Sequence, residues 1–219
     1  MLIATLAGAL LAGAGLMGLW AQSPGGGGTR EPAKLLGFGG RTWKTNFSEV
    51  SKHLKNLART SEGDERVEIM QEVRNKYILV KRNDVLYRYN FYKKPWIVKR
   101  LDRNHKQTKE EYDKVEAVLF HVKVTAPLIE AKMITDKLVE KYQKATKNNV
   151  DKKKLEGVVV WELTQGVILQ WVEPYQKRAF TRNIDYLSTD MVKIIMDEYR
   201  FYFDARERYI LQKLKFEGM

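Results

Sequence analysis

The hydrophobic and polar positions after residue 76 alternate in the way that β-strands do. Apolar or aromatic side chains recur at every second position from Val85 to Phe91, and breaks at Arg82-Asn83-Asp84 and at Lys93-Lys94-Pro95 separate this run from its neighbours. Such a pattern predicts an antiparallel meander with one apolar side. Its strands are expected near 77–81, 85–92 and 96–101.

A second hairpin is predicted over 157–173, where two apolar runs flank a turn placed at Gln165-Gly166. This turn pairs Glu162 with Leu169. Both faces of the hairpin are apolar, so we expect both faces to be covered by other parts of the protein. A third strand is expected over 179–186.

Helices are predicted where apolar residues recur at spacings of three and four. Asn46 with Glu49, and Thr108 with Glu111, have the spacing of an N-cap and its partner three residues later. Ser188 or Thr189 is expected to cap a long final helix. The predicted helices cover about 47–57, 63–75, 109–122, 128–147 and 189–214.

These elements predict an α+β fold that combines two antiparallel β meanders or hairpins, flanking helices and a long C-terminal helix. The folded domain is expected to span 41–219, with two subdomains, 41–106 and 107–219, as an alternative. Its length is sufficient for one compact domain.

The segment from Leu2 to Trp20 contains no charged side chain and predicts a single transmembrane helix. As a helix it would be about 28 Å long, close to the thickness of the hydrocarbon core of a bilayer. A cleavable signal peptide, a mitochondrial presequence and a fusion-peptide-like inserting segment are the alternatives, although no Lys or Arg precedes or interrupts the apolar run. Residues 1–22 are therefore assigned to a membrane anchor and 23–40 to a flexible Gly-rich linker.

Two further expectations concern the anchor. Small residues at helical spacing indicate a face that packs against another membrane helix, formed by Ala4, Gly8, Ala12 and Gly15. Lys and Arg are enriched after the anchor, so the positive-inside rule places the C-terminal domain on the cytoplasmic or topologically equivalent side. Digestion of this domain by protease added outside intact cells would contradict that orientation.

The charge balance narrows the class of partner. The formal net charge is +12, and every charged side chain lies from Arg30 onward, so the folded part is strongly basic. A basic surface suits anionic partners: nucleic acid, an anionic membrane face or an acidic protein. The chain has no cysteine, which excludes disulfides, zinc–thiolate sites and cysteine nucleophiles.

The sequence predicts no catalytic, metal or cofactor site and no small-molecule substrate. Its three histidines share no metal-binding spacing, and His121 is expected to be a satisfied core or boundary residue. The stretch Gly37–Thr45 resembles a phosphate loop, but Trp43 stands where glycine must precede the lysine. We expect this stretch to be a flexible approach to the first helix.

The most suggestive cluster is basic and aromatic. Ten Lys or Arg residues and two acids lie between residues 76 and 106, interleaved with aromatic rings. Three interpretations remain open: a half-buried sheet with solvated cations, contact with anionic headgroups, and contact with nucleic acid. The cations expected to be exposed and to bind an anionic surface are Lys93, Lys94, Lys99, Arg100, Arg103 and Lys106.

The leading hypothesis is a non-enzymatic, membrane-anchored structural or assembly subunit of a larger complex, such as a virion, a secretion or conjugation machine, or an organellar membrane complex. The final helix has an unusually wide apolar and aromatic face, so other subunits are its expected partners. The interface candidates on it are Tyr199, Tyr202 and Tyr209. A membrane-tethered nucleic-acid-binding protein is the alternative, and a metal-dependent hydrolase or nuclease is a remote one.

Overall fold

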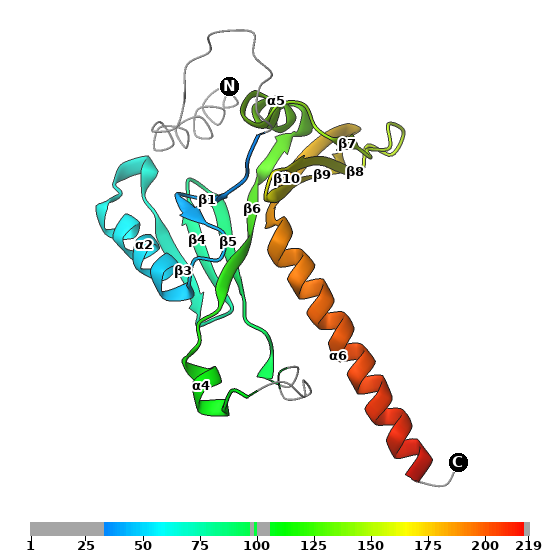
Figure 1. Ribbon diagram of the computed structural model, residues 1–219. Coiled ribbons are helices and arrows are strands. Elements are labelled where there is room, and N and C mark those ends of the chain that lie inside the picture. Colours follow the sequence, from blue (N-terminus) through cyan, green and yellow to red (C-terminus); the bar gives the residue numbers. More distant parts are fainter. Residues whose placement is uncertain (1–32, 97–98, 100–105, 217–219) are drawn as a thin grey trace, which may run out of the picture.

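One continuous antiparallel sheet organises the protein (Figure 1). The computed structural model describes residues 33–96, 99 and 106–216. The eight strands lie in the order β3-β4-β5-β6-β10-β9-β8-β7. Their bounds are Glu68–Val73 (β3), Tyr77–Arg82 (β4), Val85–Tyr92 (β5), Val118–Glu130 (β6), Lys147–Asn148 (β7), Gly157–Leu163 (β8), Gly166–Tyr175 (β9) and Arg178–Ser188 (β10).

The remaining elements are one small hairpin, one 3₁₀ turn and four helices within the described residues. A small hairpin of β1 (Gly37–Phe38) and β2 (Arg41–Thr42) precedes the first helix. The helical segments are α2 (Phe47–Thr60), the 3₁₀ turn η2 (Gly63–Glu65), α4 (Lys109–Lys114), α5 (Ala131–Tyr142) and α6 (Thr189–Phe216). The predicted α+β class is confirmed, but the two predicted meanders lie in one eight-stranded sheet instead of forming separate hairpins.

The topology repeats one unit on either side of β6. Helix α2 is followed by the meander β3-β4-β5, and α5 is followed, after the short β7, by the meander β8-β9-β10. The last strand of each meander pairs with β6, so β6 is the central strand that joins the two halves. The sequence showed no internal repeat.

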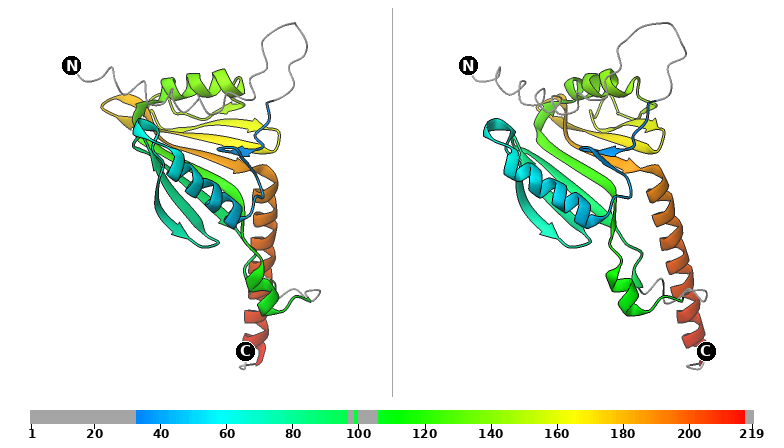
Figure 2. Two further views of the ribbon diagram at one scale, coloured as in Figure 1. Left: turned by 90° about the vertical axis from the view of Figure 1, so that its left-hand side faces the viewer. Right: turned by 60° about the vertical axis from the view of Figure 1, so that its left-hand side comes forward.

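The hydrophobic core lies on one face of this sheet. Helix α2 packs over the β3–β5 half, with the rings of Phe47 and Phe91 at 4.9 Å, and α5 packs against β6 and β10 (Figure 2). The β1–β2 hairpin covers the centre, where Phe38 contacts Tyr87, Tyr89 and Tyr186. Leu35 and Phe38, assigned from the sequence to the linker, therefore belong to the packed domain.

Two-residue turns with positive φ close two of the hairpins. Asn83 and Asp84 have φ of 50° and 59°, and Gln176 and Lys177 have φ of 48° and 62°. Two consecutive left-handed residues form the turn whose twist matches that of paired strands. The predicted strands at 77–81, 85–92 and 179–186 are confirmed, with small changes at their ends.

The turn of the β8–β9 hairpin lies one residue earlier than expected. Its central residues are Thr164 and Gln165, so Glu162 pairs with Val167 instead of Leu169. A β-carbon on Gly166 would lie 2.6 Å from Leu35 Cδ2, so this glycine permits close packing of the preceding segment. The shift of two residues leaves each side chain on its predicted face.

Three other predicted elements are wrong. Residues 63–75 form η2 and the edge strand β3, not a helix, and the helix that begins at Lys109 ends at Lys114 before β6. The expected strand at 96–101 is absent from its described positions, because Trp96 and Lys99 are helical. The Thr108–Glu111 capping box is present, whereas Asn46 makes no side-chain cap on α2.

The predicted anchor, its packing face and most of the linker lie outside the described residues. The transmembrane helix predicted over residues 2–20 thus remains an expectation from the sequence. The same holds for its predicted packing face, formed by Ala4, Gly8, Ala12 and Gly15. Within the part of the chain that the structure describes, no helix is long and apolar enough to cross a membrane.

Candidate partner-binding surfaces

The basic and aromatic region folds around Tyr112 of α4. Lys93 Nζ lies 4.0 Å from the centre of the Tyr112 ring and donates a hydrogen bond to the Tyr112 carbonyl oxygen at 2.6 Å. Lys99 and Lys109 lie 5.6 and 5.4 Å from the same ring centre. Trp96 adds a tilted ring contact at 5.3 Å. Cation–π attraction therefore holds several of these cations against the protein itself.

Because of these contacts, several of the cations that were predicted to be exposed are partly buried. Lys93, Lys94 and Lys99 are half-buried, and Lys94 forms an ion pair with Glu198 of α6 at 3.8 Å. Lys106 is exposed, while Arg100 and Arg103 lie outside the described residues. The expectation of free exposure is thus wrong for the first three, and their binding to an anionic surface stays a prediction.

Burial lowers the pKa of Lys93, and repulsion from Lys109, Lys99 and Arg74 adds to this effect, while Asp113 opposes it. The positive field around Tyr112 therefore includes Arg74, which follows β3 and was not part of the sequence-based set. Only the tertiary structure brings Arg74 to this cluster.

A second candidate surface is the face of the sheet opposite the core, which we call the open face. Alternation places Val158, Val160 and Leu169 on it, half-buried, and Trp171 is 45% exposed. The opposite side chains of the same hairpin, including Trp161 and Ile168, are fully buried. The expectation that both faces of this hairpin are covered is thus met on one face only.

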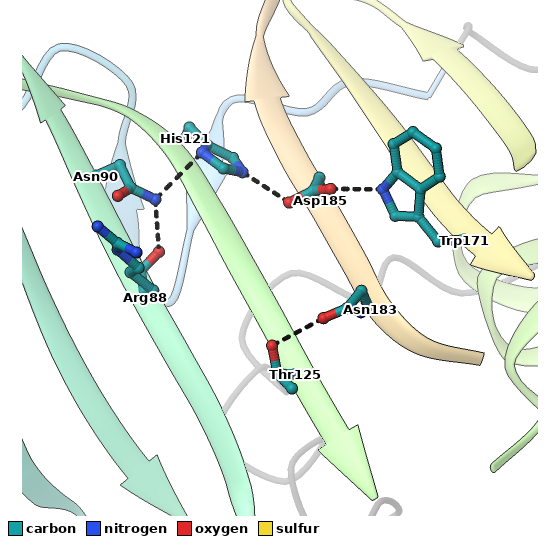
Figure 3. A network of polar contacts seen from close by, with 7 residues as sticks. All are labelled: Arg88, Asn90, His121, Thr125, Trp171, Asn183 and Asp185. Atoms are coloured by element: carbon teal, nitrogen blue, oxygen red, sulfur yellow. Dashed lines mark hydrogen bonds and ion pairs between the residues drawn. The ribbon is translucent and has the colours of Figure 1, made fainter. Parts of the chain in front are cut away.

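A hydrogen-bonded network crosses the open face through four adjacent strands (Figure 3). Asn90 Nδ2 lies 3.1 Å from His121 Nδ1 and donates to the Arg88 carbonyl oxygen. His121 Nε2 lies 2.8 Å from Asp185 Oδ1. Trp171 Nε1 donates to Asp185 Oδ2 at 2.6 Å.

The network assigns a structural role to His121. Because the Asn90 amide nitrogen can only donate, Nδ1 accepts its hydrogen bond and Nε2 carries the proton given to Asp185. Both ring nitrogens are therefore occupied, and neither can act as a base or a metal ligand without breaking the network. His121 lies on strand β6 and not on the predicted helix.

Asp185 is expected to make the free energy of unfolding depend on pH. Burial by itself would raise its pKa, but hydrogen bonds from His121 and Trp171 and the positive charge of nearby groups outweigh burial, so the pKa lies below its ordinary value. A carboxyl group with a lowered pKa in the folded state stabilises the protein above its unfolded pKa of about 4. That contribution is lost as the pH falls through the folded pKa.

We therefore expect Asp185→Asn to lower the free energy of unfolding at pH 7 and to flatten its decrease between pH 5 and pH 2. The measurement is denaturant unfolding followed by circular dichroism at several pH values. Asp136→Asn, at an exposed position on α5, is the matched control and should keep the wild-type pH profile. An Asp185→Asn profile parallel to that of the wild type would contradict this role.

Helix α6 is the third candidate surface. It begins in contact with the rest of the domain: Met191 is buried, Lys44 pairs with Asp190 at 3.5 Å, and Tyr92 of β5 donates a 2.5 Å hydrogen bond to Glu198. The helix then extends away from the sheet (Figure 1). Its 28 residues correspond to a length of about 42 Å.

Large apolar side chains are exposed on two sides of α6, and the more exposed ones form one stripe. Ile194 and Phe201, which are 42% and 36% exposed, lie on the other side of the helix. Met196, Tyr199 and Phe203 are 67%, 48% and 58% exposed, and their spacing of three and four places them on one side of the helix. The Tyr199 and Phe203 rings stack at 6.4 Å. Of the predicted interface residues, Tyr199 is exposed, whereas the side chains of Tyr202 and Tyr209 lie outside the described set.

No cluster of three or more His, Asp or Glu side chains suited to a metal ion occurs among the described residues. The described residues form an α+β protein with a one-sided core, an open sheet face and a projecting last helix. Comparisons of the chain with protein-family models, with curated proteins and with solved structures gave no match.

Proposed function

We propose that the protein is a membrane-tethered assembly subunit that binds another protein of a larger complex through α6. The observation that carries the proposal is the exposed stripe of Met196, Tyr199 and Phe203. Three large apolar side chains on a projecting helix are costly to leave in water, and aromatic residues of this kind dominate the energetics of protein interfaces.

The attachment of α6 supports the same interpretation. Contacts at Asp190, Met191 and Glu198 fix the direction in which the helix leaves the sheet. A helix held in this way presents its stripe with little loss of conformational freedom on binding. The partner surface that fits it is an apolar groove or the apolar face of another helix.

The predicted anchor adds a location to the proposal. An apolar segment at Leu2–Trp20, followed within about ten residues by a tetraglycine, would keep the basic domain close to a membrane surface. Anionic headgroups on the cytoplasmic side would then attract this domain and orient α6 relative to the membrane.

The test is a triple variant of the stripe, Met196→Ala with Tyr199→Ala and Phe203→Ala. We expect the wild-type protein, extracted in mild detergent from its native cells, to elute as a complex with a defined partner. The triple variant should release that partner, because loss of interface hot spots of about 2 kcal/mol each weakens binding far more than tenfold. Size-exclusion chromatography with light scattering and mass spectrometry measures the complex.

The matched control changes exposed charged residues of the same helix, Lys193→Ala with Asp197→Ala. It should retain the partner, because alanine preserves the helix and the apolar stripe is intact. Release from the control to the same extent as from the triple variant would contradict an interface on the stripe. A wild-type protein that elutes as a monomer would contradict the proposal as a whole.

A further inference from the structure

A basic cleft lies between α2 and the edge strand β3. It has a volume of about 530 Å³, within the range of ligand-binding clefts. Lys52, Lys55 and Arg59 line it from α2, and Arg74 lines it from the end of β3. The three α2 cations recur at spacings of three and four, so they form one row about 10 Å long.

The two carboxylates in the cleft already have structural partners. Glu72 pairs with Lys55 at 2.8 Å and accepts a hydrogen bond from Ser51, and the bond from Lys55 is the largest cause of its lowered pKa. Glu116 Oε2 accepts from the Ser48 backbone nitrogen at 3.2 Å and from Ser48 Oγ at 2.6 Å. Glu116 thus satisfies the amino end of α2, in place of the predicted Asn46 cap.

Three cations in the cleft remain without such a partner. Lys52, Arg59 and Arg74 are exposed, and within the described part of the chain no ion pair joins any of them to a carboxylate. Their charges are therefore available to a ligand. Arg74 also lies close enough to Lys93 to lower the Lys93 pKa, though burial is the larger cause. The positive surface thus continues from the cleft to the lysines around Tyr112.

We propose that this cleft binds the phosphodiester backbone of single-stranded nucleic acid. A row of cations in a groove matches a ligand with regularly repeated negative charge. The cleft is open to solvent, so an extended strand can lie along its row of cations. The aromatic ring that lines the cleft, Phe47, is buried against Phe91, so the contacts are to phosphate and carry little sequence preference.

The test is the triple variant Lys52→Gln with Arg59→Gln and Arg74→Gln in the full-length protein, solubilised in a non-ionic detergent. Fluorescence anisotropy of a labelled 20-nucleotide oligouridylate, measured between 50 and 300 mM salt, reports the affinity. Each phosphate contact contributes a slope of about −0.7 in log K against log salt, or roughly fivefold in affinity at 0.1 M. The variant should therefore lose roughly 100-fold in affinity at 0.1 M salt and flatten the slope by about 2.

The matched control removes the same charge from the opposite end of the sheet, with Lys144→Gln, Lys152→Gln and Lys153→Gln at exposed positions near β7 and β8. It should keep most of the affinity. An equal loss of affinity in both variants would contradict binding at the cleft, because net charge alone would then explain the affinity. Undetectable binding by the wild-type protein would contradict the proposal as well. Loss of binding to phosphatidylserine vesicles with retention of RNA binding would overturn it in favour of a membrane surface. Equal melting temperatures of the three proteins exclude unfolding as the cause.

Discussion

Trp161→Ala is expected to lower the free energy of unfolding by about 4 kcal/mol, which is large relative to the stability of a typical domain. The Trp161 side chain is fully buried on the core face of β8, beneath the segment that follows α5. Its Nε1 donates a 3.0 Å hydrogen bond to the Gln143 carbonyl oxygen. The variant therefore leaves both a large cavity and an unpaired carbonyl, and urea unfolding followed by circular dichroism measures the loss.

Trp171→Ala provides the matched control for this prediction. The two tryptophans lie on adjacent strands but on opposite faces of the sheet, and Trp171 is exposed. Its loss should cost about 1 kcal/mol, mainly through the hydrogen bond to Asp185. Equal destabilisation by the two changes would contradict the assignment of the core to one face.

Gln170→Leu is expected to destabilise the protein by about 2–3 kcal/mol, although it replaces a polar side chain by an apolar one. Gln170 is fully buried, and its Nε2 donates to the Ala131 carbonyl oxygen at 2.8 Å and to Thr181 Oγ1 at 2.9 Å. Thr135 Oγ1 donates to its Oε1 at 2.8 Å. Leucine would remove all three contacts: the Thr135 hydroxyl and the Ala131 carbonyl oxygen would keep their own 2.9 Å hydrogen bond, but Thr181 Oγ1 would lose its donor in a site that excludes water.

Comparison of Gln170→Leu with Gln71→Leu by denaturant unfolding separates the loss of buried hydrogen bonds from the effect of replacing any glutamine by leucine. Gln71 is exposed on the edge strand β3, so its change should stay within about 0.5 kcal/mol. A Gln170→Leu variant as stable as the wild type would show that the amide does not fasten α5 to the sheet.

The sequence carried part of the information about Gln170. Gln170 lies two residues from both Ile168 and Val172 along β9, so the alternation of side chains places all three on the core face. One partner, Thr181, lies on the next strand, β10, but the other two lie on α5, 35 and 39 residues away in sequence. Only the packing of those elements identifies Gln170 as a buried polar junction.

The largest error concerns β6, whose first residues were predicted to continue a helix. The Thr108–Glu111 capping box is real, but α4 ends at Lys114, and the strict alternation of Val122, Val124 and Ala126 belongs to a strand. A short capping signal fixes where a helix begins and not how far it continues. Hydrogen bonds from β5 and β10 on either side decide the strand.

Strand β3 was missed for a related reason. It lies at the edge of the sheet, and most of its side chains are exposed, so its sequence lacks the alternation that marks a half-buried strand. Pairing with β4, which is strongly patterned, supplies the hydrogen bonds that hold it. The sequence pattern of a short segment does not predict a strand that is held mainly by pairing with an adjacent strand.

The basic region shows the same limit in the candidate sites. The sequence located the cations around residues 93–106 but could not show that Tyr112 draws Lys93 and Lys99 against the protein. The cleft at Lys52, Arg59 and Arg74 went unpredicted because its cations are spread over two elements. On α2 they have the ordinary pattern of a solvated helix face.

By itself the sequence determined the basic character of the domain, the two strongly patterned hairpins, the first helix, and the start of the last helix at Ser188, whose hydroxyl accepts a hydrogen bond from the Met191 backbone nitrogen. Of the exposed stripe on that helix it predicted only Tyr199, and not Met196 or Phe203. These are properties of short segments, because alternation, helical spacing and capping act over a few residues. Tertiary structure alone decided that the two meanders share one sheet through β6, that the core occupies a single face, and which charges remain free. Those outcomes depend on contacts between distant segments, where burial and hydrogen-bond pairing outweigh local preference.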